Sequence, residues 1–185
     1  MPDIDTVPAD EAARAEVAGD ARLSAVLQVW LQAAGEHGVP RPRDMSALTL
    51  PPQVLPFITL LDAIDGGRSF RIRLVGTASV SAAGRDFTGR MLHEAMTGFL
   101  LQAAENRYRA AIAYRRPILA SSEYSMPDGS SIRNLIMAMP LSSDGDVVDR
   151  IIGVFSPKSD WLVRQALRTQ DALAYRKPVR SLMVF

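Results

Sequence analysis

Apolar residues recur at three- and four-residue steps in two long stretches of the chain, and this spacing predicts amphipathic helices. The first helix begins near Leu23 and ends before Gly35, and the second begins near Met96 and ends before Pro117. A third helix is predicted over 162–175. The stripe of the second helix consists of Met96, Phe99, Leu100, Ala103, Arg107, Tyr108, Ala111 and Ile112. Each stripe needs a partner surface that buries it.

Short runs of branched and aromatic residues predict the strands. Residues 57–64 and 70–76 flank Asp65-Gly66-Gly67, whose glycines can adopt the positive φ angles of a tight hairpin. Three further strands are predicted at 118–126, 132–141 and 147–155, and the middle one is apolar on both faces, as a central strand would be. Inward and outward positions alternate in the second run, with Phe70, Ile72 and Leu74 on one face and Arg71, Arg73 and Val75 on the other.

The order of these elements is strand, hairpin, strand, short helices, long helix and a three-stranded meander. It predicts an α+β domain with a five-stranded antiparallel sheet, helices on one face, and additional helices at both ends of the chain. We divide the chain into a tail, amphipathic helix and Pro-rich connector (1–44), a core (45–156), and a C-terminal helix and tail (157–185). The apolar end, Leu182 to Phe185, is expected to dock on the domain.

Composition narrows the function classes. The chain has 185 residues, of which 48% are hydrophobic and 22% charged, as in ordinary globular proteins. It has no cysteine, which excludes disulfides, thiolate metal sites and a cysteine nucleophile. The net charge of +1 provides no electrostatic attraction for nucleic acid, so nucleic-acid binding is not expected. Neither an export signal nor an apolar run long enough for a membrane span is present, so we expect a cytoplasmic protein.

The sequence offers no catalytic motif. It lacks a Gly-rich phosphate loop, a Gly-x-Ser-x-Gly elbow, histidines at metal spacing and an acidic cation cluster, so we expect no enzyme. The two histidines are His37 and His93. His93 lies near the start of the long helix, and haem binding through it is the least favoured of the functions considered. We name no cofactor.

Four segments resemble one known family. They are FRIRLVGTA (70–78), DFTGR (86–90), YRRPI (114–118) and MPLSSDGDVVDRIIG (139–153), and their order is similar to the PAS_5 branch of the PAS superfamily, whose members are common as stand-alone proteins in alphaproteobacteria. The tryptophan-bearing helix with Trp30 and the connector 39–44 fit the same branch. The resemblance covers about 23–155. It implies a PAS fold and names no ligand.

The DFTGR segment also has a purely structural interpretation. Asp86 is expected to accept backbone N–H groups at a helix start, and Gly89 to adopt a left-handed conformation. Arg90 is expected to pair with Asp86, four residues earlier.

Within a PAS-like cup, a ligand would lie between the sheet and the long helix, where its polar groups need partners. Asn134 is a polar residue on a central strand, flanked by Ile132 and Ile136. Candidate ligand-binding residues are Asn134, Tyr108, Tyr124 and Arg73, the last as partner of a carboxylate. Each also has a structural alternative: Asn134 bonded to a loop, the tyrosines at the rim of the core, and Arg73 extended into solvent.

We therefore expect a stand-alone sensory or signalling module that binds a small molecule, a partner protein or both. The alternative is an assembly module whose core is filled by its own side chains. A homodimer is expected through the stripe of the first helix, made of Leu23, Val26, Leu27, Trp30 and Leu31. The competing outcome is that this stripe packs on the outer face of its own sheet.

Overall fold

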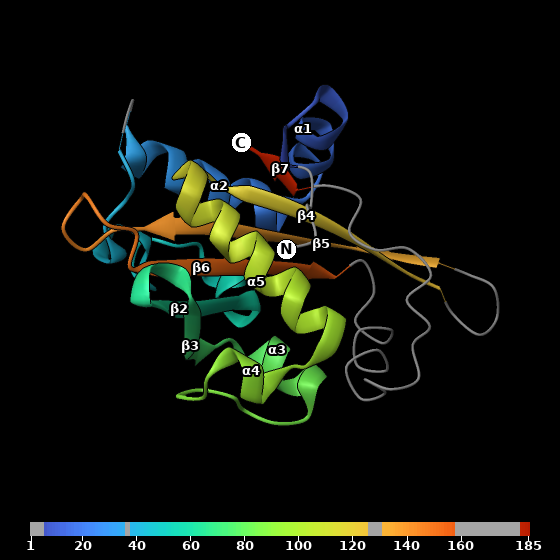
Figure 1. Cartoon of the computed structure of the whole chain (residues 1–185). Helices are drawn as coiled ribbons and strands as arrows, with labels where there is room; N and C mark the ends of the chain where they lie inside the picture. The colour runs from blue at the N-terminus through green and yellow to red at the C-terminus, as the bar shows by residue number, and fades with distance from the viewer. Residues whose placement is uncertain (1–5, 36–37, 126–130, 158–181) are drawn as a thin grey trace.

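The computed structural model describes residues 6–35, 38–125, 131–157 and 182–185. These residues form a mixed α+β fold in which helices lie on both faces of one sheet (Figure 1). The strands are β1 (Thr6–Pro8), β2 (Ile58–Ile64), β3 (Ser69–Val75), β4 (Ile118–Ser125), β5 (Ser131–Leu141), β6 (Arg150–Pro157) and β7 (Leu182–Val184). The α-helices are α1 (Glu11–Ala18), α2 (Ala21–Ala34), α3 (Thr77–Ala83), α4 (Leu92–Ala95) and α5 (Gly98–Tyr114). Short 3-10 helices are η1 (Pro42–Met45), η2 (Pro52–Phe57) and η3 (Asp65–Gly67).

The described sheet has seven strands in the order β1-β7-β4-β5-β6-β2-β3. Strands β3-β2-β6-β5-β4 are antiparallel neighbours, as the sequence predicts. The prediction of five strands was nevertheless incomplete, because β7 pairs antiparallel with β4 and β1 pairs parallel with β7. Both added strands have three residues, too few to show an alternating pattern. Docking of the apolar C-terminal end is confirmed, since Leu182 is buried.

The two faces of the sheet carry separate apolar layers. On β5, Leu135, Met137 and Met139 belong to one layer and Ala138 to the other, so this strand is covered on both sides as predicted. We call the face under α1, α2 and η2 the outer face, and the face under α4 and α5 the inner face. The inner layer places Ala104, Tyr108 and Ala111 of α5 against residues of six strands: Leu61, Phe70, Ile72, Ile118, Ala120, Ala138, Ile151 and Leu182. No helix in the described part of the chain is long and apolar enough to cross a membrane.

On the outer face, buried polar contacts near both ends of α2 attach this helix to the sheet. Asp20 caps the helix by accepting from the backbone N–H groups of Arg22 and Leu23, each at 3.1 Å. Its second oxygen accepts from the hydroxyl of Ser156 in β6 at 2.5 Å. Near the other end, Trp30 Nε1 donates to the backbone oxygen of Pro140 at 2.9 Å. These contacts hold α2 along the outer face.

The stripe predicted as a dimer interface lies in this layer. Leu23, Val26, Leu27 and Trp30 are buried within the chain, with exposed fractions between 0% and 8%, and Leu31 is 45% exposed. The four buried residues share one apolar cluster with Leu135, Met137, Met139, Ile152 and Val154 of the sheet. The interface prediction is therefore corrected for these four residues, because side chains covered by their own sheet cannot also contact a second copy. The competing prediction, intramolecular packing, is the one the structure has.

The segment between β3 and α5 corrects a second expectation. Asp86 accepts from the backbone N–H of Thr88 at 2.8 Å, and this bond lowers the pKa of the Asp86 carboxyl. The turn precedes α4 and does not start a helix. Arg90 pairs with Glu94, four residues later, at 3.7 Å. Glu94 also accepts from the backbone N–H of Met91 at 2.7 Å.

Replacing Gly76 by alanine is expected to cost roughly 3 kcal/mol of stability or more, the upper end for overpacking. A Cβ at this position would collide with the backbone carbonyl of Pro56 and lie 2.7 Å from the oxygen of Leu55, and backbone atoms cannot move aside as side chains can. Gly19→Ala is the matched control, because its Cβ would lie 3.4 Å from its nearest neighbour, an ordinary contact. Urea denaturation would measure both changes, and equal midpoints for the two variants would contradict the steric argument.

Candidate functional site

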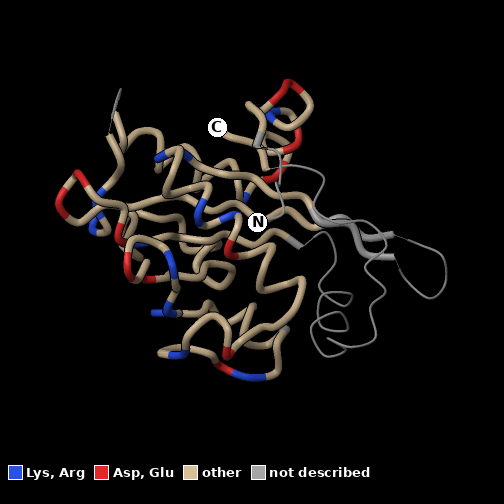
Figure 2. The backbone as a smooth tube through the Cα atoms, viewed as in Figure 1, with Lys and Arg blue, Asp and Glu red and all other residues tan. Residues whose placement is uncertain are grey.

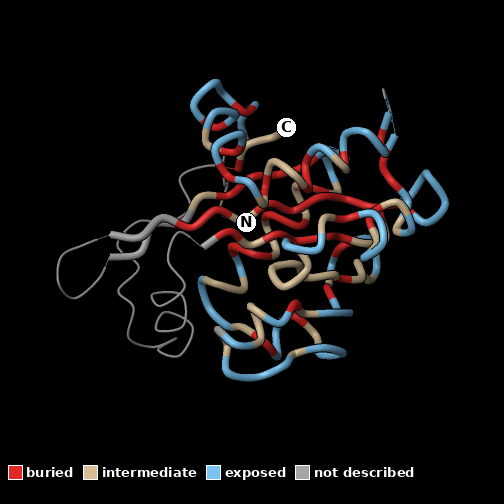
Figure 3. The backbone as a smooth tube through the Cα atoms, turned by 180° about the vertical axis from the view of Figure 1, so that it is seen from behind, coloured by how far each residue is buried: buried red, intermediate tan, exposed pale blue. Residues whose placement is uncertain are grey.

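Buried polar side chains gather where α5 packs on the inner face. Arg107 and Tyr108 of α5 and Asn134 of β5 are exposed by only 6%, 6% and 3%. α5 contacts β4, β5 and β7, so these residues come from elements packed on one another. Figure 3 shows the central strands buried along the sheet. A polar group in such a layer is costly unless it is hydrogen-bonded.

Asn134 faces α5. Leu135, Met137 and Met139 point to the outer layer and Ala138 to the inner one, and the register with β4 is continuous from Ser131 to Ala138. Alternation therefore places Asn134 on the inner face. Its Oδ1 accepts no hydrogen bond from the described residues. A buried amide oxygen without a donor costs about 1–3 kcal/mol, which a bound donor would recover.

Arg107 is the second such group. Among the described residues, its Nε has no hydrogen-bond partner and no carboxylate forms an ion pair with it. Its guanidinium carbon lies 5.1 Å from the centre of the Tyr108 ring, a weak cation–π contact. An arginine stays charged even when it is buried, and an uncompensated buried charge is expensive. The positive charge of Arg107 is thus buried without a carboxylate partner among the described residues.

Tyr108 makes two contacts across the inner layer. Its ring meets that of Phe70 edge to face, with centroids 5.2 Å apart. Its hydroxyl end reaches β6 at Gly153, where a Cβ would lie 4.0 Å from the Tyr108 oxygen. Gly153 leaves room there because it has no side chain. The phenol therefore spans from β3 to β6 beneath α5.

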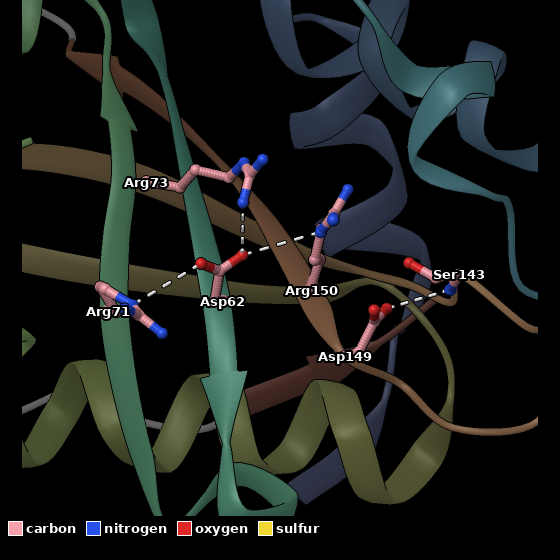
Figure 4. Close-up of polar contacts among 6 residues, drawn as sticks. All are labelled: Asp62, Arg71, Arg73, Ser143, Asp149 and Arg150. Carbon is pink, nitrogen blue, oxygen red and sulfur yellow. Dashed lines mark hydrogen bonds and ion pairs between the residues drawn. The ribbon is translucent and has the colours of Figure 1, made fainter. Parts of the chain in front are cut away.

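Two of the four ligand-binding residues named from sequence, Asn134 and Tyr108, are buried at the inner face. The backbone of Tyr124 lies in β4, opposite Ile132, and its side chain is outside the described part of the structure. Arg73 was wrongly placed, because it lies on the outer face beside Asp62 (Figure 4). It alternates with the buried residues Phe70 and Ile72, so the strand itself turns it away from α5.

Sequence reasoning missed Arg107. It stands in the apolar stripe of the long helix, between Ala103 and Tyr108, where an arginine interrupts a pattern that is otherwise buried. That interruption was the available signal. His93 of α4 is exposed, so it does not enter the inner layer. Among the described residues, no group of three or more His, Asp or Glu side chains could hold a metal ion.

No protein-family model matches the chain, and no curated protein matches it. Solved structures do resemble it. The PAS domain of BvgS from Bordetella pertussis is 17% identical with a TM-score of 0.45, and the match covers 65% of this chain and 91% of that one. The light-state LOV domain of the blue-light photoreceptor Aureochrome1 is 19% identical with a TM-score of 0.40, covering 64% and 94%.

A third similar structure is VqmA bound to DPO, a protein of Vibrio cholerae. It is 16% identical with a TM-score of 0.43, and the match covers 58% of this chain and 54% of that one. PAS and LOV domains are thus among the structures that this fold resembles.

Proposed function

We propose that this chain is a PAS-type sensory module that binds a small carboxylate-bearing molecule between α5 and the inner face of its sheet. Support for the PAS type is the order of elements: the β2–β3 hairpin, short helices, the long α5 and the meander β4 to β6. The segments FRIRLVGTA and DFTGR support the PAS_5 branch. The role is binding and signalling, without catalysis.

The observation that carries the ligand proposal is that α5 and β5 each bury a polar atom without a hydrogen-bond partner among the described residues. Arg107 Nε is a charged donor without an acceptor, and Asn134 Oδ1 is an acceptor without a donor. A carboxylate suits the first, because arginine binds carboxylates through charge-assisted hydrogen bonds. A hydroxyl or amine suits the second. Together they favour a small hydroxy- or amino-carboxylate over a neutral or purely apolar ligand.

The test is a thermal-shift screen of the full chain against hydroxy- and amino-carboxylates, with their neutral amide analogues as controls. A ligand at about one hundred times its Kd would stabilise the protein by about 2.7 kcal/mol. Arg107→Met is expected to abolish this shift. It should leave the melting temperature without ligand equal or higher, because an apolar side chain of similar length removes a buried charge without opening a cavity.

A matched control comes from the surface. Arg90→Gln removes an arginine that is 68% exposed in its side chain, and it should keep the full ligand shift. Two outcomes would refute the proposal: no carboxylate in the panel shifts the wild type, or Arg107→Met keeps the wild-type shift. The first would favour the alternative in which the chain fills its own core and acts as an assembly module.

A further inference from the structure

The outer face of the sheet is covered unevenly. α2 and η2 pack on β6, whereas the outward side chains of β3 are exposed. Arg71 and Arg73 alternate with the buried residues Phe70 and Ile72, so both point to the outer face. Figure 4 shows them with Arg150 of β6 around Asp62 of β2, while α5 lies on the opposite side of the sheet. We call Arg71, Arg73 and Arg150 the arginine face.

Asp62 lies at the centre of the arginine face. Its carboxylate is 3.8 Å from Arg71 Nε, 3.5 Å from Arg73 Nη1 and 3.6 Å from Arg150 Nε. The Asp62 side chain is 20% exposed, whereas those of Arg71 and Arg73 are each 51% exposed. The Asp62 carboxylate is therefore mostly buried, whereas the guanidinium groups of Arg71 and Arg73 are accessible to another molecule.

One carboxylate is too little for three guanidinium groups. Each guanidinium carries about five N–H donors, whereas a carboxylate offers about four acceptor sites. Asp149 is adjacent in sequence to Arg150, but its carboxylate accepts from the backbone N–H of Ser143 at 3.0 Å (Figure 4). It forms no ion pair with the three arginines in the described structure. The arginine face thus keeps excess positive charge and unused donors on the surface.

We propose that the arginine face docks an acidic segment of a partner protein that presents two carboxylates about 6–7 Å apart. Arg71 and Arg73 are two residues apart on β3, a separation of roughly 6.7 Å in a regular strand, and the register shift with β2 lies at Arg73. Carboxylates at i and i+4 of a helix have Cβ atoms about 5–6 Å apart, close to this spacing. Arginine matches a carboxylate with two parallel hydrogen bonds. Asp62 already holds the guanidinium groups, so less ordering is needed on binding.

Two other occupants fit less well. The acidic helix α1 follows β1, at the opposite edge of the sheet from β3, so it does not reach the arginine face of its own chain. Figure 2 shows its acidic positions apart from the basic positions of β3. Nucleic acid binding uses a tract of cations that neutralises about six to ten phosphates, whereas this face has three arginines around a carboxylate.

The test measures binding of the full chain to a fluorescent helical peptide with glutamate pairs at i and i+4, by anisotropy at low salt. The same peptide with glutamine in place of glutamate is the matched probe. Arg71→Gln combined with Arg73→Gln is expected to weaken binding at least about tenfold, as loss of contacting charges does, and added salt should weaken the wild-type complex. Arg73→Gln alone serves if the double variant does not fold, as judged by thermal melting.

The control removes the same charge elsewhere. Arg41, which precedes η1, and Arg43, within it, are both exposed. Changing both to glutamine should keep binding within about twofold, because only distant screened charge is lost. The proposal is overturned if the control weakens binding as much as the arginine-face variant does, or if the glutamine peptide binds equally well. Tighter binding of duplex DNA, or a dimer that dissociates in the arginine-face variant, would assign the face to nucleic acid or to a second copy instead.

Discussion

Replacing Trp30 by alanine is expected to lower the free energy of unfolding by about 3–5 kcal/mol. The indole is completely buried between α2 and the sheet, so its removal leaves a large cavity in the outer layer. It also leaves the oxygen of Pro140 without the hydrogen bond that Trp30 donates at 2.9 Å. The two losses act together on the contact that joins α2 to the centre of the sheet.

Urea denaturation of Trp30→Ala and of a control variant in the same helix measures the change in the free energy of unfolding. Leu31→Ala removes an apolar side chain of the same helix that is 45% exposed, and it should cost under about 1 kcal/mol, since little packing is lost. A Trp30→Ala protein as stable as Leu31→Ala would mean that α2 does not pack on the sheet as described. In that case the stripe would again be available for a second copy.

A chain that begins at Val39 is expected not to fold, which is the largest effect foreseen here. Removing α1 and α2 uncovers the outer apolar face of three central strands, including Leu135, Met137 and Ile152, which are buried in the full chain. An exposed apolar face of that kind drives aggregation. Near-UV circular dichroism and dye binding should report a loss of fixed tertiary packing.

The homodimer stays a prediction. Light scattering of the full chain would test it by measuring the molar mass in solution. If the full chain is dimeric, the contact should use a surface other than Leu23, Val26, Leu27 and Trp30, because these side chains are covered by their own sheet. A truncated chain that folds cooperatively as a monomer, from a dimeric parent, would contradict this account of α2. It would restore the stripe as the interface.

Periodicity predicted the faces of the elements but not what covers them. The stripe of α2 and the alternation of β3 as far as Ile72 follow from the sequence, since each depends on local geometry. The predicted alternation is wrong beyond Ile72, where a register shift with β2 leaves Leu74 44% exposed. Whether Trp30 meets its own sheet or a second copy depends on contacts more than one hundred residues away, such as that with Pro140. The same limit explains Arg73 and Arg107. Both are arginines in amphipathic elements, and only the packing of those elements shows which one is buried.

The added strands have a consequence for how this protein can associate. A bare β4 edge would offer a row of free backbone groups to a strand of another molecule. Here β7 occupies that edge and β1 follows it, with Pro8, which has no N–H to donate, at its end. At the other edge, Ile72 of β3 exchanges backbone hydrogen bonds with Gly89 and Arg90 at 2.7 and 2.8 Å. Because both edges of the sheet are protected in this way, addition of a strand from another molecule is disfavoured. Copies or partners would then bind through the faces of the sheet and its helices.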